Sequence, residues 1–479
     1  MFMSAVNEPI DVERGNRSKK PGKRNFIVIG TIIIIALIFA GLSYYQATRF
    51  NPNITINGIK VGGMTSDQVM NKLKTSKLKN RVYIGKELIL DEKDTQMAFT
   101  DQDLPEVKKL LKKQWTFFPS TKSKDYSLAP EKTDQFRSQT MKKLTEDKLV
   151  ALNKNLQAPQ DAQVKWDQGK IVISESKDGE QYDINALLKD YDKQIYTSDI
   201  HLEPVFIQPI KSDSPIIKEN EKRLQGFIQR TIDYKVQDKV YTLKANELIK
   251  KASISNDGKI SIIDSDIQKK VEEINNAQST LNKDFKFKTH SGKVITVKAG
   301  GYGWAINAEK ETEMLQKAFE KGKKSTSASN IYGLGWNNEG IGYETTANNG
   351  IGDTYAEVSI ADQRIWIYKN GKLVVTTHVV TGKMSTNEGT SPGVWYVLYK
   401  ASPYTLRGSA VGNPNYSVDV KYWVPFTNDG QGFHDADWRK NWAGNAYLKQ
   451  GSAGCVNTPP DVMKTVYDNL NTYDPVVVY

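Results

Sequence analysis

The sequence contains a single cysteine, Cys455, among 479 residues. One cysteine excludes an intrachain disulfide, and it excludes a zinc site built on paired cysteines. Histidine is almost as rare, and the four histidines are too scattered along the chain to predict a metal cluster. They are His201, His290, His378 and His434. We therefore expect no metal and no cofactor, so that any chemistry must come from ordinary side chains.

Charge of one sign is not concentrated in a block, because acidic and basic residues are interspersed along most of the chain. The formal net charge is nevertheless +11. A basic balance of this kind favours polyanionic surroundings. Zinc-finger spacing and an aromatic-rich RNA-binding signature are both missing, so we expect no nucleic-acid partner. An anionic lipid surface or an anionic cell wall suits the charge equally well.

One long apolar run interrupts this polar sequence, at residues 26–45 (FIVIGTIIIIALIFAGLSYY). About twenty uncharged residues are enough to cross the hydrocarbon core of a bilayer as a helix. The basic residues that precede the run assign residues 1–25 to the cytoplasm as a basic tail. A cleaved signal peptide is the alternative, but the run is longer than a signal core and no small-x-small cleavage site follows. We expect a single-pass membrane protein whose remaining domains lie outside the cell.

The sequence between the apolar run and residue 335 predicts two α+β modules, at 51–212 and 213–335. A weak internal repeat supports them, because GKIVISESKDGEQYDINALLKDY aligns with GKVITVKAGGYGWAINAEKETEML with one gap. Each copy predicts a strand, a glycine turn and an amphipathic helix, capped by Asn185 in one copy and Asn307 in the other. The alternative is chance similarity between two ordinary strand–turn–helix units.

From residue 353 onward the pattern changes to short runs that alternate apolar and polar residues. YAEVSIADQRIWIYKNGKLVVTTHVVTG contains two such runs, separated by Asn370-Gly371. That dipeptide is the strongest short signal for a β-hairpin. GVWYVLYK and YSVDVKYWVPF continue the strand pattern. Residues 353–479 are therefore predicted to form a mostly-β domain with helices near the C-terminus.

The cysteine lies in the stretch GFHDADWRKNWAGNAYLKQGSAGCVNTPPDVM, with His434 upstream of it. Small residues before Cys455 leave the sulfur open and let backbone N–H groups approach a reacting carbonyl. A helix is expected to start near Thr458, and both the positive end of its dipole and a nearby imidazole would lower the pKa of the thiol. A nucleophile with a base is the minimum for acyl transfer through a thioester. An inert buried cysteine is the alternative.

Other residues around this pair are candidates for supporting roles. Asp435 follows the histidine and could orient its ring or simply lie in solvent. Trp423, Trp438 and Trp442 flank the site and are candidates to line a substrate cleft, although tryptophans at this density more often pack in a core.

The same stretch resembles the active-site signature of the L,D-transpeptidase catalytic domain of the YkuD type. That family carries a histidine and, after a spacer, a Ser/Thr-His-Gly-Cys-hydrophobic-Asn block. Here the block is Ser452-Ala453-Gly454-Cys455-Val456-Asn457. VKAGGYGWAINAEKE and NGIKVGGMTSDQV are similar to the wall-associated, peptidoglycan-binding-like modules that precede this domain in Gram-positive members.

The resemblance implies a role for each matching residue. Cys455 would be the nucleophile and His434 the general base. Ser452 and Asn457 would support the loop, and the N–H groups around Gly454 would contribute to an oxyanion hole. The implied reaction takes the acyl group of the third stem residue from a donor tetrapeptide of peptidoglycan and releases D-alanine. The thioester then passes to a side-chain amine of a neighbouring stem, which forms a 3→3 cross-link. Carbapenems commonly acylate members of this family.

One position departs from the family pattern, because Ala453 stands where the family carries its second histidine. Loss of an auxiliary hydrogen bonder implies a rate lower by about 10²–10³. If that histidine were the base, the chain would be a catalytically impaired wall-binding protein that retains the fold. A sortase-like thiol acyltransferase is a third interpretation, which the missing Arg-rich strand after the cysteine disfavours. If His434 activates the thiol, acylation should rise through a pH midpoint below that of a free thiol, about 8.5.

Overall fold

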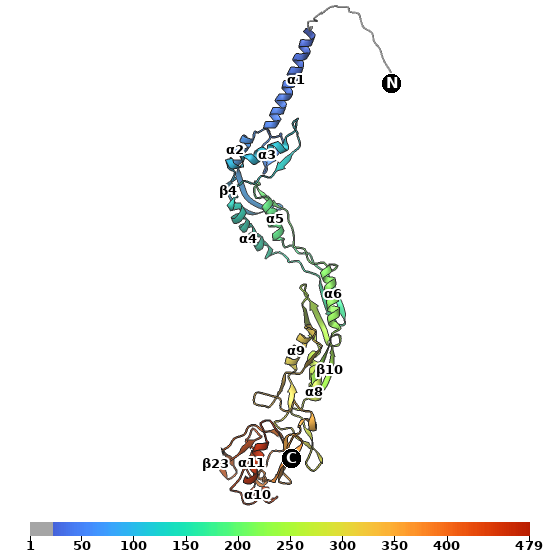
Figure 1. The fold of residues 1–479 in the computed structure, drawn as a ribbon, viewed down its shortest axis with the longest axis vertical. Helices are drawn as coiled ribbons and strands as arrows, with labels where there is room; N and C mark the ends of the chain where they lie inside the picture. The colour runs from blue at the N-terminus through green and yellow to red at the C-terminus, as the bar shows by residue number, and fades with distance from the viewer. Residues whose placement is uncertain (1–22) are drawn as a thin grey trace, which may run out of the picture. The chain divides into compact units, whose positions relative to one another are not determined.

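The computed structural model describes residues 23–479, so most of the basic tail predicted at 1–25 lies outside the described residues. The chain divides into two compact units. Unit 1 comprises the described residues up to 161 together with 177–209, and unit 2 comprises 162–176 and 210–479. Figure 1 shows the elements of both units in chain order.

The N-terminal helix α1 (Lys23–Thr48) contains the apolar run. Its segment Ile27–Thr48 has a mean hydropathy of 2.6 over the most apolar window, and none of that window is buried inside the protein. Such a helix is long and apolar enough to cross a membrane. A membrane anchor and a signal sequence share these properties.

Unit 1 combines α-helices with two three-stranded sheets. Its elements after α1 include β1 (Ile54–Ile56), β2 (Ile59–Lys60), α2 (Ser66–Thr75), β3 (Lys77–Ile84), β4 (Glu87–Gln96), α3 (Leu104–Gln114), β5 (Lys124–Tyr126), α4 (Lys142–Asn153), α5 (Ile184–Lys193) and β8 (Ile200–Leu202). The sheet β2-β1-β5 shares an apolar core with α2 and α3, and the sheet β4-β3-β8 shares a second core with α4 and α5. Mixed α/β structure in this region agrees with the prediction.

The first part of unit 2 is a further α/β domain. Its elements include β6 (Gln163–Asp167), β7 (Lys170–Ser174), α6 (Pro215–Ile228), β9 (Thr231–Val236), β10 (Lys239–Lys244), β11 (Ile249–Ile254), β12 (Ile260–Ser265), α8 (Ile267–Gln278), α9 (Ala308–Glu320) and β16 (Ser325–Ser327). The sheets β12-β11-β6-β7 and β10-β9-β16 enclose one apolar core with the three helices. Because β6 pairs with β11, the β6–β7 hairpin belongs to unit 2, whereas the range predicted for the first module, 51–212, includes it.

The internal repeat predicted from the sequence is not confirmed in its detail. In the first copy β7 is the edge of a four-stranded sheet, whereas β14 (Val294–Val297) of the second copy pairs with the preceding strand β13 (Phe285–Lys288) in a separate hairpin. Asn307 caps α9 as predicted, since its side chain accepts a hydrogen bond from the N–H of Lys310. The prediction for Asn185 is wrong, because Asp183 caps α5.

The β13–β14 hairpin packs on the last domain of unit 2. Phe285 and Phe287 share an apolar core with Tyr355 and Tyr396. At the hairpin turn the backbone N–H of His290 lies 2.8 and 3.0 Å from the two carboxylate oxygens of the buried Glu357. The hairpin is therefore bound to that domain through both apolar packing and a charge-assisted hydrogen bond.

The last domain is mostly β, as predicted. Its elements include β18 (Tyr355–Ser359), β19 (Arg364–Lys369), β20 (Lys372–His378), β21 (Gly393–Tyr396), β22 (Tyr404–Ala410), β23 (Asn413–Val420), β24 (Trp423–Pro425), β25 (Gly432–Asp435), β26 (Val456–Thr458), α11 (Pro460–Asn469) and β27 (Pro475–Val478). The sheets β20-β19-β18-β27-β21 and β24-β25-β26 pack with α11 around one core. The turn between β19 and β20 is the predicted Asn370-Gly371, and both residues have the positive φ that it requires.

Candidate active site

Two neighbouring strands bring the predicted dyad together. β25 and β26 pair in parallel, with His434 opposite Asn457, and Cys455 directly precedes β26. His434 and Cys455 both line a cavity of about 310 Å³. The other lining residues are Leu406, Ala410, Asn413, Tyr416, Val418, Trp438, Arg439, Gly451, Ser452, Ala453 and Asn457. The backbone pairing therefore places a thiol and an imidazole in one cavity.

The His434 ring is buried and held at both nitrogens. Its Nδ1 lies 2.8 Å from the backbone carbonyl oxygen of Asp435, so Nδ1 carries the proton. With the Asn457 amide oriented by its partners, its nitrogen lies 3.1 Å from Nε2 and donates to it. Burial lowers the pKa of His434. The hydrogen bond and the charge of Asp435 oppose this effect, and the charge of Arg439 makes a smaller lowering contribution. The ring is therefore neutral at pH 7, with a lone pair on Nε2, as a general base requires.

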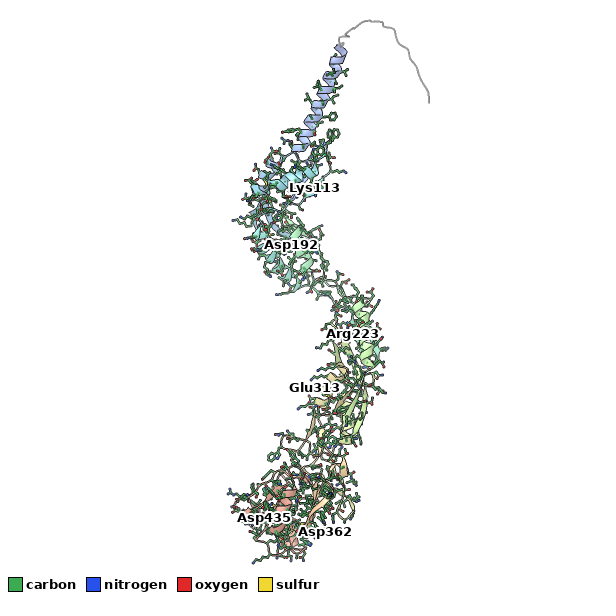
Figure 2. The ribbon with its side chains drawn as sticks, viewed as in Figure 1. Lys113, Asp192, Arg223, Glu313, Asp362 and Asp435 are labelled. Carbon is green, nitrogen blue, oxygen red and sulfur yellow. The ribbon has the colours of Figure 1, made fainter. Side chains whose placement is uncertain are left out.

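Asp435 orients the ring through its backbone and not through its carboxylate. Both carboxylate oxygens accept backbone hydrogen bonds, from Lys421 at 3.1 Å and from Tyr422 at 2.8 Å. Asp435, labelled in Figure 2, is buried in the last domain. Of the two predicted alternatives, Asp435 contacts the ring and does not lie in solvent, and the contact is made by its backbone carbonyl.

Cys455 is buried and packs against apolar side chains. Its side chain is 7% exposed and packs in a cluster with Leu406, Val420 and Trp423. Burial raises the pKa of the Cys455 thiol to about 11, against a smaller opposing effect of a backbone hydrogen bond from Gly432. The thiol is therefore protonated at rest, which is the reverse of the direction predicted from the sequence.

The predicted activation by a helix terminus is also absent at this site. α11 begins at Pro460, next to the predicted start, but the three residues of β26 lie between it and Cys455. Three extended residues span about 10 Å. The field of a helix terminus falls off within its first turn, so the dipole of α11 does not lower the pKa of the thiol.

The loop that carries Cys455 is fixed by hydrogen bonds on both sides. Ser452, predicted to support the loop, donates from its hydroxyl to the carbonyl oxygen of Cys455 at 2.5 Å. Thr390 donates to the carbonyl oxygen of Gly454 at 2.7 Å. Gly454 has φ +110°, and a Cβ there would approach the Gln431 side chain to 3.0 Å. Glycine is therefore required at this position.

The three tryptophans have different environments. Trp438 is 47% exposed, lines the cavity and stacks on the His434 ring at 5.8 Å. Trp423 is buried and stacks on Tyr404, and Trp442 lies 6.0 Å beneath the Arg439 guanidinium. Neither is among the residues that line the cavity. Only Trp438 fits the predicted cleft role.

Several residues of the site were not predicted. Thr390 holds the loop, and the Gln431 side chain lies beside Gly454. Arg439 holds Asn457, whose amide oxygen lies 3.0 Å from Nε and 2.8 Å from Nη2 of the guanidinium. Tyr416 and Leu406 reach the cavity from the β22–β23 hairpin. Of these residues, Gln431 and Arg439 lie near His434 in the sequence, three residues before it and five after it, whereas the others come from distant segments.

Two family models match the chain. The model for the L,D-transpeptidase catalytic domain matches residues 353–478, and the model described as "Putative peptidoglycan binding domain" matches residues 226–328. Among curated proteins none matches.

Solved structures of Enterococcus faecium L,D-transpeptidase are similar to this chain. The crystal structure of a cysteine-to-serine mutant is 31% identical and covers 55% of this chain and 100% of that chain, with a TM-score of 0.45. The catalytic domain acylated by ertapenem is 40% identical and covers 27% of this chain and 98% of that chain, with a TM-score of 0.25. On this identity and coverage, the chain belongs to the L,D-transpeptidase family, whose members are acyltransferases.

The two pKa shifts predict the pH dependence of acylation. If His434 is the base, the second-order rate constant for acylation by ertapenem should be nearly flat from pH 7 to pH 10. It should fall only below pH 6.5, as protonation removes the neutral ring. The measurement is the initial rate of adduct formation followed by intact mass. A rate that instead rises about tenfold per pH unit toward the thiol pKa near 11 would mean that only pre-formed thiolate reacts.

Proposed function

We propose that this chain is a membrane-anchored peptidoglycan L,D-transpeptidase that forms 3→3 cross-links through a thioester on Cys455. The observation that carries the proposal is one cavity lined by a buried thiol and a neutral, backbone-anchored imidazole. A nucleophile and a base held together in this way are suited to acyl transfer.

The first half-reaction uses only these side chains and the loop. The Cys455 sulfur attacks the carbonyl carbon of the third stem residue, and its proton moves to Nε2 of His434. Backbone N–H groups at Gly454 and Cys455 bind the oxyanion. As the C–N bond breaks, His434 returns the proton to the departing amine, which leaves as D-alanine. The acyl group remains on Cys455 as a thioester.

The second half-reaction reverses the proton's path. A side-chain amine of a neighbouring stem attacks the thioester and gives a proton to His434. The new amide bond forms as the C–S bond breaks, and the thiolate takes the proton back from the imidazolium. Because Asn457 donates to Nε2 at rest, each transfer requires that hydrogen bond to be exchanged for one to the reacting group.

The rest of the chain supports the proposed location at the cell membrane and the proposed substrate, peptidoglycan. The match of residues 226–328 to a peptidoglycan-binding model supports the wall-associated role predicted for module 213–335. We assign the same role to module 51–212. The helix Ile27–Thr48 supports an anchor in the cell membrane, with the N-terminus in the cytoplasm and the catalytic domain at the cell wall.

A second candidate is a catalytically impaired wall-binding protein that retains the fold. Ala453 favours it, because a methyl group lines the cavity where the family carries a histidine. Within residues 23–479, moreover, no hydrogen bond joins the His434 ring to the Cys455 sulfur, whose acceptor at 3.6 Å is the carbonyl oxygen of Gly430.

Covalent labelling separates the two candidates. The full chain in detergent, incubated with ertapenem, should gain the mass of one carbapenem, and Cys455→Ala should gain none. His434→Ala should label at least about 10²-fold more slowly, since it lacks the general base. His378→Ala is the matched control, because His378 is an exposed histidine of the same domain, and it should label like the parent. An unlabelled parent chain between pH 6 and 10 would support the wall-binding candidate.

Restoring the family histidine at position 453 measures how much Ala453 lowers the acylation rate. Ala453→His should accelerate acylation by up to about 10²–10³, the effect of one hydrogen bonder to a developing charge. The comparison is the acylation rate constant of the variant against that of the parent and of Ala453→Gln. An unchanged rate would show that Arg439, Asn457 and His434 already supply what the family histidine supplies.

A further inference from the structure

Arg439 lines the cavity that holds Cys455 and His434. Its guanidinium is half-buried and donates from Nε and Nη2 to the amide oxygen of Asn457 and from Nη1 to the carbonyl oxygen of Gln450 at 2.9 Å. The ring of Trp442 lies 6.0 Å from its central carbon. All of these partners are neutral.

The charge of Arg439 has no carboxylate partner within residues 23–479. Burial lowers the pKa of Arg439, and no acidic group opposes that effect. Of the two nearest acidic residues in sequence, Asp435 already accepts from two backbone N–H groups. Asp437 is exposed, and among the described residues it forms no ion pair with Arg439. A half-buried cation without a counter-ion is unfavourable, and a bound anion would relieve that cost.

The donors of the guanidinium show where an anion can bind. A guanidinium has five N–H bonds, and the contacts to Asn457 and Gln450 engage three of them. One N–H remains on each terminal nitrogen. Two donors on one planar group suit the two oxygens of a carboxylate.

We infer that Arg439 binds the C-terminal carboxylate of the donor stem peptide, next to the bond that Cys455 attacks. This inference rests on the proposed function. In a tetrapeptide donor, the departing D-alanine carries that carboxylate one residue beyond the scissile carbonyl. The carboxylate of the departing D-alanine therefore lies close to the Cys455 sulfur when the donor is bound for attack.

The contact also sets the length of the stem that reacts. A pentapeptide places its carboxylate one residue farther from the scissile carbonyl, about 3.3–3.6 Å along an extended chain. The same guanidinium then meets a neutral amide in place of a carboxylate. Arg439 thus selects stems that end at the fourth residue.

The test compares two donors that differ only at the C-terminus, a tetrapeptide acid and its C-terminal amide. The full chain in detergent is given each donor with an amine acceptor, and release of D-alanine or D-alanine amide is followed by mass spectrometry. A hydrogen-bonded charge pair contributes about 1.5–3 kcal/mol, so kcat/KM should favour the acid by roughly 10- to 150-fold. In Arg439→Gln that ratio should fall to near one.

The ratio of kcat/KM for the acid donor to kcat/KM for the amide donor distinguishes binding of the substrate by Arg439 from positioning of Asn457 by Arg439. Loss of the contact to Asn457 slows both donors equally and leaves the ratio unchanged, so an unchanged ratio in Arg439→Gln overturns the inference. Arg439→Lys keeps the charge and should retain part of the preference. Arg407→Gln, which changes an exposed arginine of β22, should keep the parent ratio. Equal rates with both donors in the parent overturn the inference but leave the proposed function intact. No release from either donor overturns both.

Discussion

Burial of the thiol and the imidazole in one cavity is the constraint on which the account of this site depends. Burial penalises the charged form of each group, which raises the pKa of Cys455 and lowers that of His434. The pair therefore rests as a neutral thiol and a neutral base. In the proposed mechanism, proton transfer from Cys455 to His434 therefore accompanies attack on the substrate carbonyl, and no thiolate forms before the substrate binds.

The surrounding contacts keep that neutral base in one tautomer. Asp435 holds Nδ1 through its backbone carbonyl, and Arg439 holds Asn457, which in turn faces Nε2. Arg439 also disfavours a proton on the ring, because its own charge lies close by. One arginine therefore orients the ring and adds to the effect of burial on its pKa, and in the proposed contact it also presents a cation to the substrate.

The sequence predicted the parts of the fold that local patterns encode. The apolar helix, the Asn370-Gly371 turn and the start of α11 are all signalled within a few residues, and the structure contains each of them. The pairing of β6 with β11 was missed, because its partner strand lies in another segment of the chain. The direction of the thiol pKa was wrong for a related reason. Burial depends on distant residues such as Leu406 and Val420, and a motif does not reveal them.

The central claim is that Cys455 is a protonated thiol in the resting protein. The most direct measurement is the ultraviolet difference spectrum of the full chain against Cys455→Ala, which isolates the thiolate absorbance, titrated from pH 5 to pH 11. The account predicts no thiolate signal at pH 7 and a rise only as the pH nears 11. A thiolate signal already present at pH 7, with a midpoint below 7, would contradict it.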